Sequence, residues 1–234
     1  GYKSGGFNPS TLSIVPVRPE KIDAFELGFK HASRACDFNL AGYYYKYDDL
    51  QVTAYQGPIT SLVNAAKAKI YGIEADVAIR PVAGLTITAA GAWNHARYKS
   101  FPGAPLYAFD LVTGISVTPG DASGRPIVNA PEFSGNVNAT YVQPLPSGSL
   151  EFTGNFSYQS VVYYDAFQAT KQDAYGVLNL RAAWNSGDDR LSIALFLDNA
   201  TNKDYVRSIF QQPVAFSSSW APPRSAGIEL RYRL

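Results

Sequence analysis

Apolar and polar residues alternate with a period of two along most of this chain. From Ala226 to Leu234 every second residue is apolar, and Glu229 and Arg231 lie between them. Successive side chains of a β-strand point to opposite faces, so the pattern predicts a strand with one apolar and one polar face. Comparable alternation predicts strands over 24–30, 38–47, 71–80, 85–94, 136–141, 150–159, 176–184 and 191–198. The register is ambiguous at Tyr43-Tyr44-Tyr45, and Phe196 breaks the alternation in its strand.

The connections between these predicted strands are short and long in turn. The short ones are 31–36, 81–84, 144–149 and 185–189, and the long ones are 49–65, 98–129, 164–173 and 199–223. A further loop, 8–20, precedes the first strand, and Ser61–Lys69 is either a short helix or a loop leading into a strand. Short turns therefore gather at one end of the sheet and long loops at the other, which is typical of an antiparallel transmembrane β-barrel rather than a soluble sandwich.

Strand length and face chemistry favour the same all-β class. The chain has no uninterrupted apolar run of about 18 residues, so we expect no transmembrane helix. A barrel strand needs only one apolar face for lipid, and its other face meets a wet or plugged lumen. We expect the following charged residues to face the lumen or a plug: Glu26, Glu74, Asp76, Arg181, Glu229 and Arg231.

Composition narrows the possible functions. Lysine and arginine total 20 against 19 acidic residues, so a net charge of +1 gives no electrostatic case for nucleic-acid binding. The chain has 16 tyrosines and 13 phenylalanines. Aromatic residues tend to lie near predicted strand ends, where their rings suit a membrane–water boundary, although tyrosine and tryptophan also simply suit strands. The chain has no methionine, so we expect a processed chain or a fragment.

Candidate catalytic and metal chemistry is weak. The sequence has no nucleophile elbow, P-loop or zinc-protease motif, and its two histidines, His31 and His95, are far apart. The single cysteine, Cys36, excludes an internal disulfide framework. We therefore expect no enzyme, no cofactor and no resident metal. A barrel phospholipase remains an alternative, for which His95 is the only candidate base.

The long loops are the better candidates for binding. Aromatic residues with hydrogen-bonding neighbours on surface loops suit capture of a large amphipathic ligand, although aromatics can also pin the loops. The candidate ligand-binding residues are Tyr107, Phe109, Arg125, Phe210, Gln211 and Trp220.

Several segments resemble the β-barrel of TonB-dependent outer-membrane receptors. The opening Gly-Tyr-Lys-Ser-Gly-Gly-Phe-Asn is similar to a segment of that family, and further matches follow in the family's order. These matches are residues 18–30, 44–52, 65–74, 129–133, 195–205 and 223–232. One departure is Leu234, where the family usually ends in phenylalanine.

The resemblance implies the fold and function of the family. Residues 1–234 would be a partial barrel domain: the C-terminal nine to ten strands of a 22-stranded barrel, without its plug, N-terminal strands or TonB box. The expected function is active uptake of a scarce ligand, most often a ferric siderophore, with iron present only as part of that ligand. The expected partners are outer-membrane lipid, the plug and, through it, the TonB complex.

The same resemblance implies a multi-pass protein of the Gram-negative outer membrane with a periplasmic C-terminus. Two alternatives stay open: a passive porin or channel, and a receptor for haem, cobalamin or a glycan.

Overall fold

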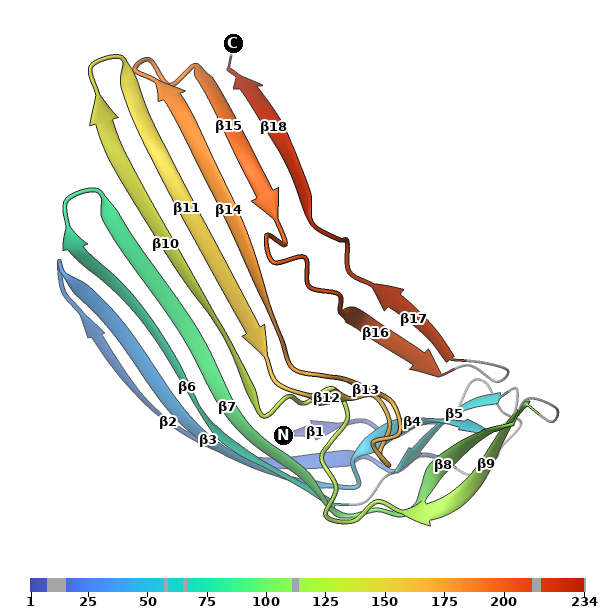
Figure 1. Cartoon of the computed structure of the whole chain (residues 1–234). Helices are drawn as coiled ribbons and strands as arrows, with labels where there is room; N and C mark the ends of the chain where they lie inside the picture. Colours follow the sequence, from blue (N-terminus) through green and yellow to red (C-terminus); the bar gives the residue numbers. More distant parts are fainter. Residues whose placement is uncertain (8–15, 57–58, 65–66, 111–113, 212–215, 234) are drawn as a thin grey trace.

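The computed structural model describes residues 1–7, 16–56, 59–64, 67–110, 114–211 and 216–233. One antiparallel sheet of ten strands dominates it, in the spatial order β1-β2-β3-β6-β7-β10-β11-β14-β15-β18 (Figure 1). The strands are β1 (Tyr2–Lys3), β2 (Glu20–Ala32), β3 (Cys36–Asp48), β6 (Lys67–Val82), β7 (Leu85–Ser100), β10 (Phe133–Leu145), β11 (Gly148–Gln159), β14 (Tyr175–Ser186), β15 (Leu191–Asp198) and β18 (Ser225–Tyr232). This confirms the all-β prediction.

The two ends of the sheet differ as the connection lengths predict. Short turns join β2 to β3, β6 to β7, β10 to β11 and β14 to β15. The long connections form hairpins of their own at the other end, where the N-terminus lies (Figure 1). These hairpins are β4 (Gln51–Gln56) with β5 (Ile59–Asn64), β8 (Pro102–Asp110) with β9 (Gly114–Asp121), β12 (Val162–Tyr163) with β13 (Lys171–Gln172), and β16 (Val206–Gln211) with β17 (Phe216–Trp220).

The helix considered at Ser61–Lys69 is wrong for the residues that are described. Residues 61–64 belong to β5 and residues 67–69 to β6. The alternative, a loop leading into a strand, holds only for the strand β6 that begins at Lys67, because residues 61–64 are themselves strand. No helix in the described ranges is long and apolar enough to cross a membrane.

The strand register sorts side chains onto two faces. Leu27 is 83% exposed and Ile228 is 73% exposed, and both lie on the face that we call the apolar face. The charged Glu26, Glu74 and Glu229 alternate with these residues and lie on the polar face. A large exposed apolar surface is expected of a sheet that faces lipid.

The register also settles the ambiguous positions. Tyr44 lies opposite Tyr71 on the apolar face, so Tyr43 and Tyr45 lie on the polar face. Phe196 is on the polar face, opposite Gly227. A Cβ on Gly227 would come within 2.5 Å of the Phe196 ring, so glycine makes room for this bulky side chain.

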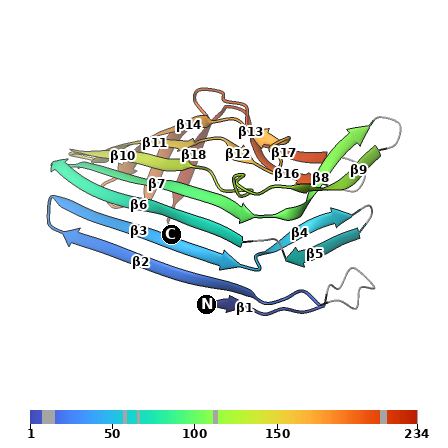
Figure 2. The same ribbon diagram turned by 90° about the horizontal axis from the view of Figure 1, so that it is seen from below.

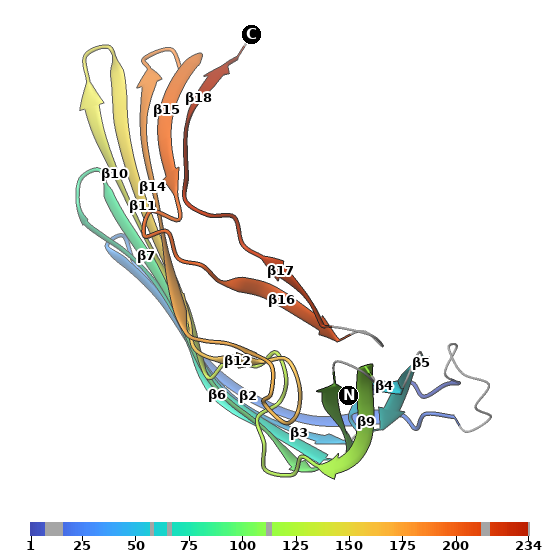
Figure 3. The same ribbon diagram turned by 45° about the vertical axis from the view of Figure 1, so that its right-hand side comes forward.

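The polar face is the concave one. Figure 2 shows the strands side by side as a wall, and Figure 3 shows that the wall is curved, with the β16–β17 hairpin on its concave side. Tyr98, on the polar face of β7, lines the same cavity as Arg207 and Ile209 of β16. The polar side chains therefore face the space that a closed barrel would enclose.

Candidate ligand site at the loop end of the sheet

A cavity of about 440 Å³ lies at the loop end, between segments from four of the long connections. Strands β4 and β8, the loop that contains β12 and strand β16 all contribute to its walls. Its lining combines aromatic and polar groups, among them Gln51, Tyr107, Tyr164 and Arg207. A concave site with a few convergent polar groups is the usual form of a small-molecule site.

A small apolar core holds these loops together. Tyr98 is 2% exposed and its ring centroid lies 5.0 Å from that of Phe101. Ala104, Ala122 and Ala166 pack around this pair, and each belongs to a different part of the loops. Because alanine is small, the segments approach one another closely, and burial of the aromatic rings supplies the hydrophobic stabilisation.

Arg125 joins two of the loops. Its Nη1 donates a hydrogen bond of 3.2 Å to the carbonyl of Phe167, and its guanidinium lies 5.0 Å from the centroid of that ring. This contact places Arg125 between the long connection that precedes β10 and the one that precedes β14. In this structure its observed contacts are those of a residue that positions the loops.

Asp165 organises the loop between β12 and β13. Its carboxylate accepts hydrogen bonds from the backbone N–H groups of Phe167, Ala169 and Thr170 at 2.8, 3.2 and 2.5 Å. The hydroxyl of Thr170 adds a fourth at 2.6 Å. Asp165 is 5% exposed, so these bonds satisfy a buried charge and fix the loop that carries the lining residues Tyr164 and Ala166.

Tyr164 presents a protonated hydroxyl to the same region. Burial raises the pKa of its phenol, so the hydroxyl keeps its proton at neutral pH. That hydroxyl donates to the carbonyl of Val206 at 3.4 Å, which ties the loop to β16. The contact brings Tyr164 beside Arg207, the cationic group of the cavity wall.

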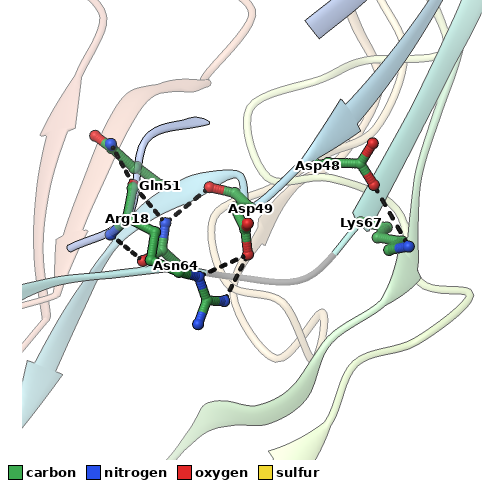
Figure 4. A network of polar contacts seen from close by, with 6 residues as sticks. All are labelled: Arg18, Asp48, Asp49, Gln51, Asn64 and Lys67. Atoms are coloured by element: carbon green, nitrogen blue, oxygen red, sulfur yellow. Dashed lines mark hydrogen bonds and ion pairs between the residues drawn. The ribbon is translucent and has the colours of Figure 1, made fainter. Parts of the chain in front are cut away.

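A polar network braces the N-terminal segment against the β4–β5 hairpin (Figure 4). The amide of Asn64 donates to the carbonyl of Arg18 at 2.9 Å and accepts from the Arg18 N–H at 2.7 Å. The Arg18 guanidinium lies 2.5 Å from Asp49, and this hydrogen bond and charge raise the arginine pKa. Asp49 therefore faces Arg18, whereas its neighbour Asp48 faces Lys67 (Figure 4).

Gln51 belongs to both the network and the cavity. Its Nε2 donates to the carbonyls of Ser4 and Arg18, both at 3.1 Å. Its Oε1 is buried and has no hydrogen-bond partner among the described residues. Because Nε2 is committed to two carbonyls, Oε1 is held in place as an acceptor beside the cavity.

The sequence candidates for ligand binding fall into three groups. Tyr107 lines the cavity. Arg125 and Trp220 are not among its lining residues, and Trp220 is 63% exposed on β17. The side chains of Phe109, Phe210 and Gln211 lie outside what the structure describes.

Sequence reasoning missed Gln51, Tyr164 and Arg207. The first two stand at the ends of predicted loops, and Arg207 lies in the middle of one. Only the way the loops fold back brings the three together. The weak signal available was their position in long connections at one end of the sheet.

The charged residues expected in the lumen all lie on the polar face. Arg181 pairs with Glu229 at 3.0 Å, across the intervening strand β15, and Arg231 approaches the same carboxylate at 3.2 Å. Asp76 accepts a hydrogen bond of 2.7 Å from Asn39, and Glu26 accepts one from Tyr45. Glu74 lies between these groups on β6, opposite Ala41. Whether they contact a plug stays a prediction.

Metal-binding clusters of histidine, cysteine or carboxylate are not found in the part of the chain that the structure describes. The loop-end cavity is lined by aromatic and aliphatic side chains together with one guanidinium, one carboxylate, a serine and two amide side chains. These groups can hold an organic ligand by stacking and hydrogen bonding.

Comparison with known proteins gives a consistent result. A family model described as TonB dependent receptor-like, beta-barrel matches residues 1–200. The pesticin receptor of Yersinia pestis is 24% identical over 210 residues, which are 88% of this chain and 28% of that protein. The chain therefore spans less than a third of the length of this relative.

Solved structures share the fold. The ferric yersiniabactin uptake receptor FyuA of Yersinia pestis has a TM-score of 0.77 and 19% identity, over 99% of this chain and 33% of that one. The ferric preacinetobactin receptor BauA of Acinetobacter baumannii has a TM-score of 0.69 and 18% identity, over 99% and 32%. At such identities the likeness concerns the fold.

Proposed function

Since the chain belongs to the TonB-dependent receptor family through its β-barrel, we propose that it forms part of an outer-membrane receptor for a ferric siderophore. The structural neighbours FyuA and BauA are named as receptors for ferric yersiniabactin and ferric preacinetobactin. The family consists of transport receptors, so the proposal includes no covalent chemistry. Uptake would be energised by the TonB complex acting through a plug domain.

The observation that carries the proposal is the cavity at the loop end. Its volume of about 440 Å³ is in the range of small-molecule sites, and its aromatic and polar lining suits an amphipathic organic ligand. The β16–β17 hairpin lies on the concave side of the wall, which supports a role for this cavity in ligand capture (Figure 3). In an outer-membrane barrel the long loops are extracellular and the short turns are periplasmic, so the proposal puts this cavity outside the cell and the C-terminus in the periplasm.

Iron uptake tests the function directly. Cells that express the full-length receptor and cells that lack it are grown under iron starvation with defined ferric siderophores. We expect faster growth and accumulation of radioactive iron only with the receptor and one class of siderophore. Equal uptake with and without the receptor would contradict the proposal, and uptake of haem, cobalamin or a glycan instead would assign a different ligand.

The cavity is tested by substitution in the full-length receptor. Arg207→Ala and Tyr107→Ala each remove a lining side chain, and we expect each to weaken ligand binding by about tenfold or more, as loss of a central contact residue does. Arg224→Ala is the matched control, because Arg224 is exposed at the loop end and does not line the cavity. Calorimetry with the transported siderophore measures the change. Equal affinities for all three variants would place the ligand elsewhere.

A further inference from the structure

Basic side chains gather on the apolar face at the loop end of β3, β6 and β7. Lys69 lies opposite Lys46 on one side and Arg97 on the other. Together with neighbouring lysines they line a hollow of about 380 Å³. We call the following five side chains the outer basic cluster: Lys46, Lys67, Lys69, Arg97 and Lys99.

Aromatic residues lie immediately below this cluster, toward the turn end. Tyr44 and Tyr71 lie opposite each other, and the Tyr71 ring contacts His95 at 4.8 Å and Trp93 at 5.8 Å. Beyond them the face is apolar, as at Ile73, which is 49% exposed. Tyrosine and tryptophan mark the headgroup level of a membrane, so the cations stand at or just beyond that level.

Carboxylates neutralise only part of the cluster. Asp48 lies 3.3 Å from the Lys46 ammonium and 3.5 Å from that of Lys67, and Asp23 lies 4.0 Å from Lys46. Within the described residues, no ion pair joins Lys69, Arg97 or Lys99 to a carboxylate. The cluster therefore carries excess positive charge on a surface that faces lipid.

One of the lysines without an ion pair among the described residues, Lys69, is also held in place. The Lys69 Nζ lies 4.9 Å from the centroid of Tyr44 and 5.2 Å from that of Tyr71. Arg97 is anchored more weakly, by a hydrogen bond of 3.5 Å to the carbonyl of Gly124. Cation–π contacts with two rings fix the ammonium beside the membrane boundary and leave its N–H donors available.

The wall strands in the other half of the sheet carry no charged side chain on their apolar face. The apolar-face residues near the loop ends of β11, β14, β15 and β18 are Tyr158, Gly176, Leu197 and Ala226. Among the wall strands, basic residues of the apolar face are thus confined to the adjacent strands β2, β3, β6 and β7, where Lys21 of β2 lies opposite Asp48. A general attraction to a charged membrane would not require such a concentration.

We propose that the outer basic cluster binds the phosphate groups of a lipid headgroup in the membrane leaflet nearest the loops. Phosphate oxygens accept charge-assisted hydrogen bonds from ammonium and guanidinium groups, and clustered basic residues are a known means of recognising anionic headgroups. The acyl chains of the same lipid would lie on the apolar surface below the two tyrosines. The proposal rests on the outer-membrane placement and is independent of which ligand is transported.

Native mass spectrometry of the full-length receptor with bisphosphorylated lipid A tests this. The variant K69Q/R97Q/K99Q removes three charges from the cluster. We expect its affinity for the lipid to fall about 100-fold, since each basic residue near an anionic surface contributes about fivefold. The charge-matched control K171Q/K203Q/R224Q alters exposed residues at the loop end outside the cluster and is expected to keep the wild-type affinity.

Three outcomes would overturn the proposal: an unchanged affinity of the cluster variant, an equal loss in the control, or equally tight binding of dephosphorylated lipid A. Full displacement of the lipid by millimolar inorganic phosphate would assign the site to a free anion instead. If the triple variant fails to assemble, the single variant Lys99→Gln replaces it in the test, and its affinity for lipid A is expected to fall about fivefold. Lys69→Arg keeps the charge and is expected to keep the affinity. Siderophore uptake is measured separately, so a failure of either proposal leaves the other standing.

Discussion

At the scale of single residues, the wall of the sheet depends on where side chains are absent as well as where they are present. Gly72 lies on the polar face opposite Tyr43. A Cβ at this position would come within 2.8 Å of the Tyr43 ring carbon Cζ and would also collide with the carbonyl of Trp93. Since the carbonyl belongs to the backbone, no side-chain rotation relieves the clash.

We therefore expect Gly72→Ala to lower the free energy of unfolding by about 1–3 kcal/mol, as overpacking does. Gly42→Ala is the matched control on the neighbouring strand, because the nearest atom to its new Cβ would be 3.9 Å away. Urea unfolding of the full-length receptor in lipid vesicles measures both. Equal stability of the two variants would show that the sheet adjusts at Gly72.

Alternation in the sequence was sufficient to predict the face of nearly every wall residue, including the six charged residues now seen on the polar face. It failed to resolve Tyr43-Tyr44-Tyr45, because tyrosine is acceptable on either face. It also treated Phe196 as an exception without a cause. The cause is the absence of a side chain at Gly227, which stands on another strand.

At the scale of elements, the membrane-facing strands were predictable and the loop hairpins were not. A strand that faces lipid must keep one side apolar, so apolar residues recur at every second position of its sequence. The hairpin β8–β9 meets no such requirement, and β8 contains Pro102 and Pro105. The hairpins therefore lacked a readable pattern, and the cavity that they form could not be foreseen.

The loop between β12 and β13 depends on one carboxylate. Replacing Asp165 with alanine removes four hydrogen bonds, so we expect faster hydrogen exchange at the amides of Phe167, Ala169 and Thr170. The loss of local stability should be about 1–3 kcal/mol. Ligand affinity should fall as well, because Tyr164 and Ala166 line the cavity.

Asp173→Ala is the control for this prediction. Asp173 is exposed, and its carboxylate pairs with Lys171 at 2.7 Å. Such surface pairs contribute little, so exchange in the loop should stay at the wild-type rate. Unchanged exchange in the Asp165 variant would contradict the role assigned to that carboxylate.

At the scale of the whole molecule, the sheet is an open wall. Strands β1 and β18 each pair along one edge only within the described residues. Backbone N–H and C=O groups without partners cost several kcal/mol each in lipid, so an open edge does not persist in a membrane. The wall therefore requires further strands to complete a barrel.

This leads to a prediction about residues 1–234 expressed and refolded alone. We expect no discrete ion conductance when this segment is added to a planar lipid bilayer, because a sheet curved as one part of a larger barrel would leave its two edge strands unpaired in lipid. The full-length receptor serves as the control for insertion, assessed by its resistance to protease. Stable, uniform channels from the segment would show that it closes on its own.

The unequal lengths of the strands have a topographic consequence. Strands β6 and β7 each contain 16 residues, whereas a tilted strand needs about 9–11 to cross the hydrocarbon layer. At about 3.3 Å per residue and a tilt of about 45°, the excess raises the β8–β9 hairpin by roughly 12–16 Å above the lipid. On intact cells this hairpin would stand among the surface sugars, within reach of an antibody. A peptide tag placed between Asp110 and Gly114 would then report the receptor's presence without breaking the cell.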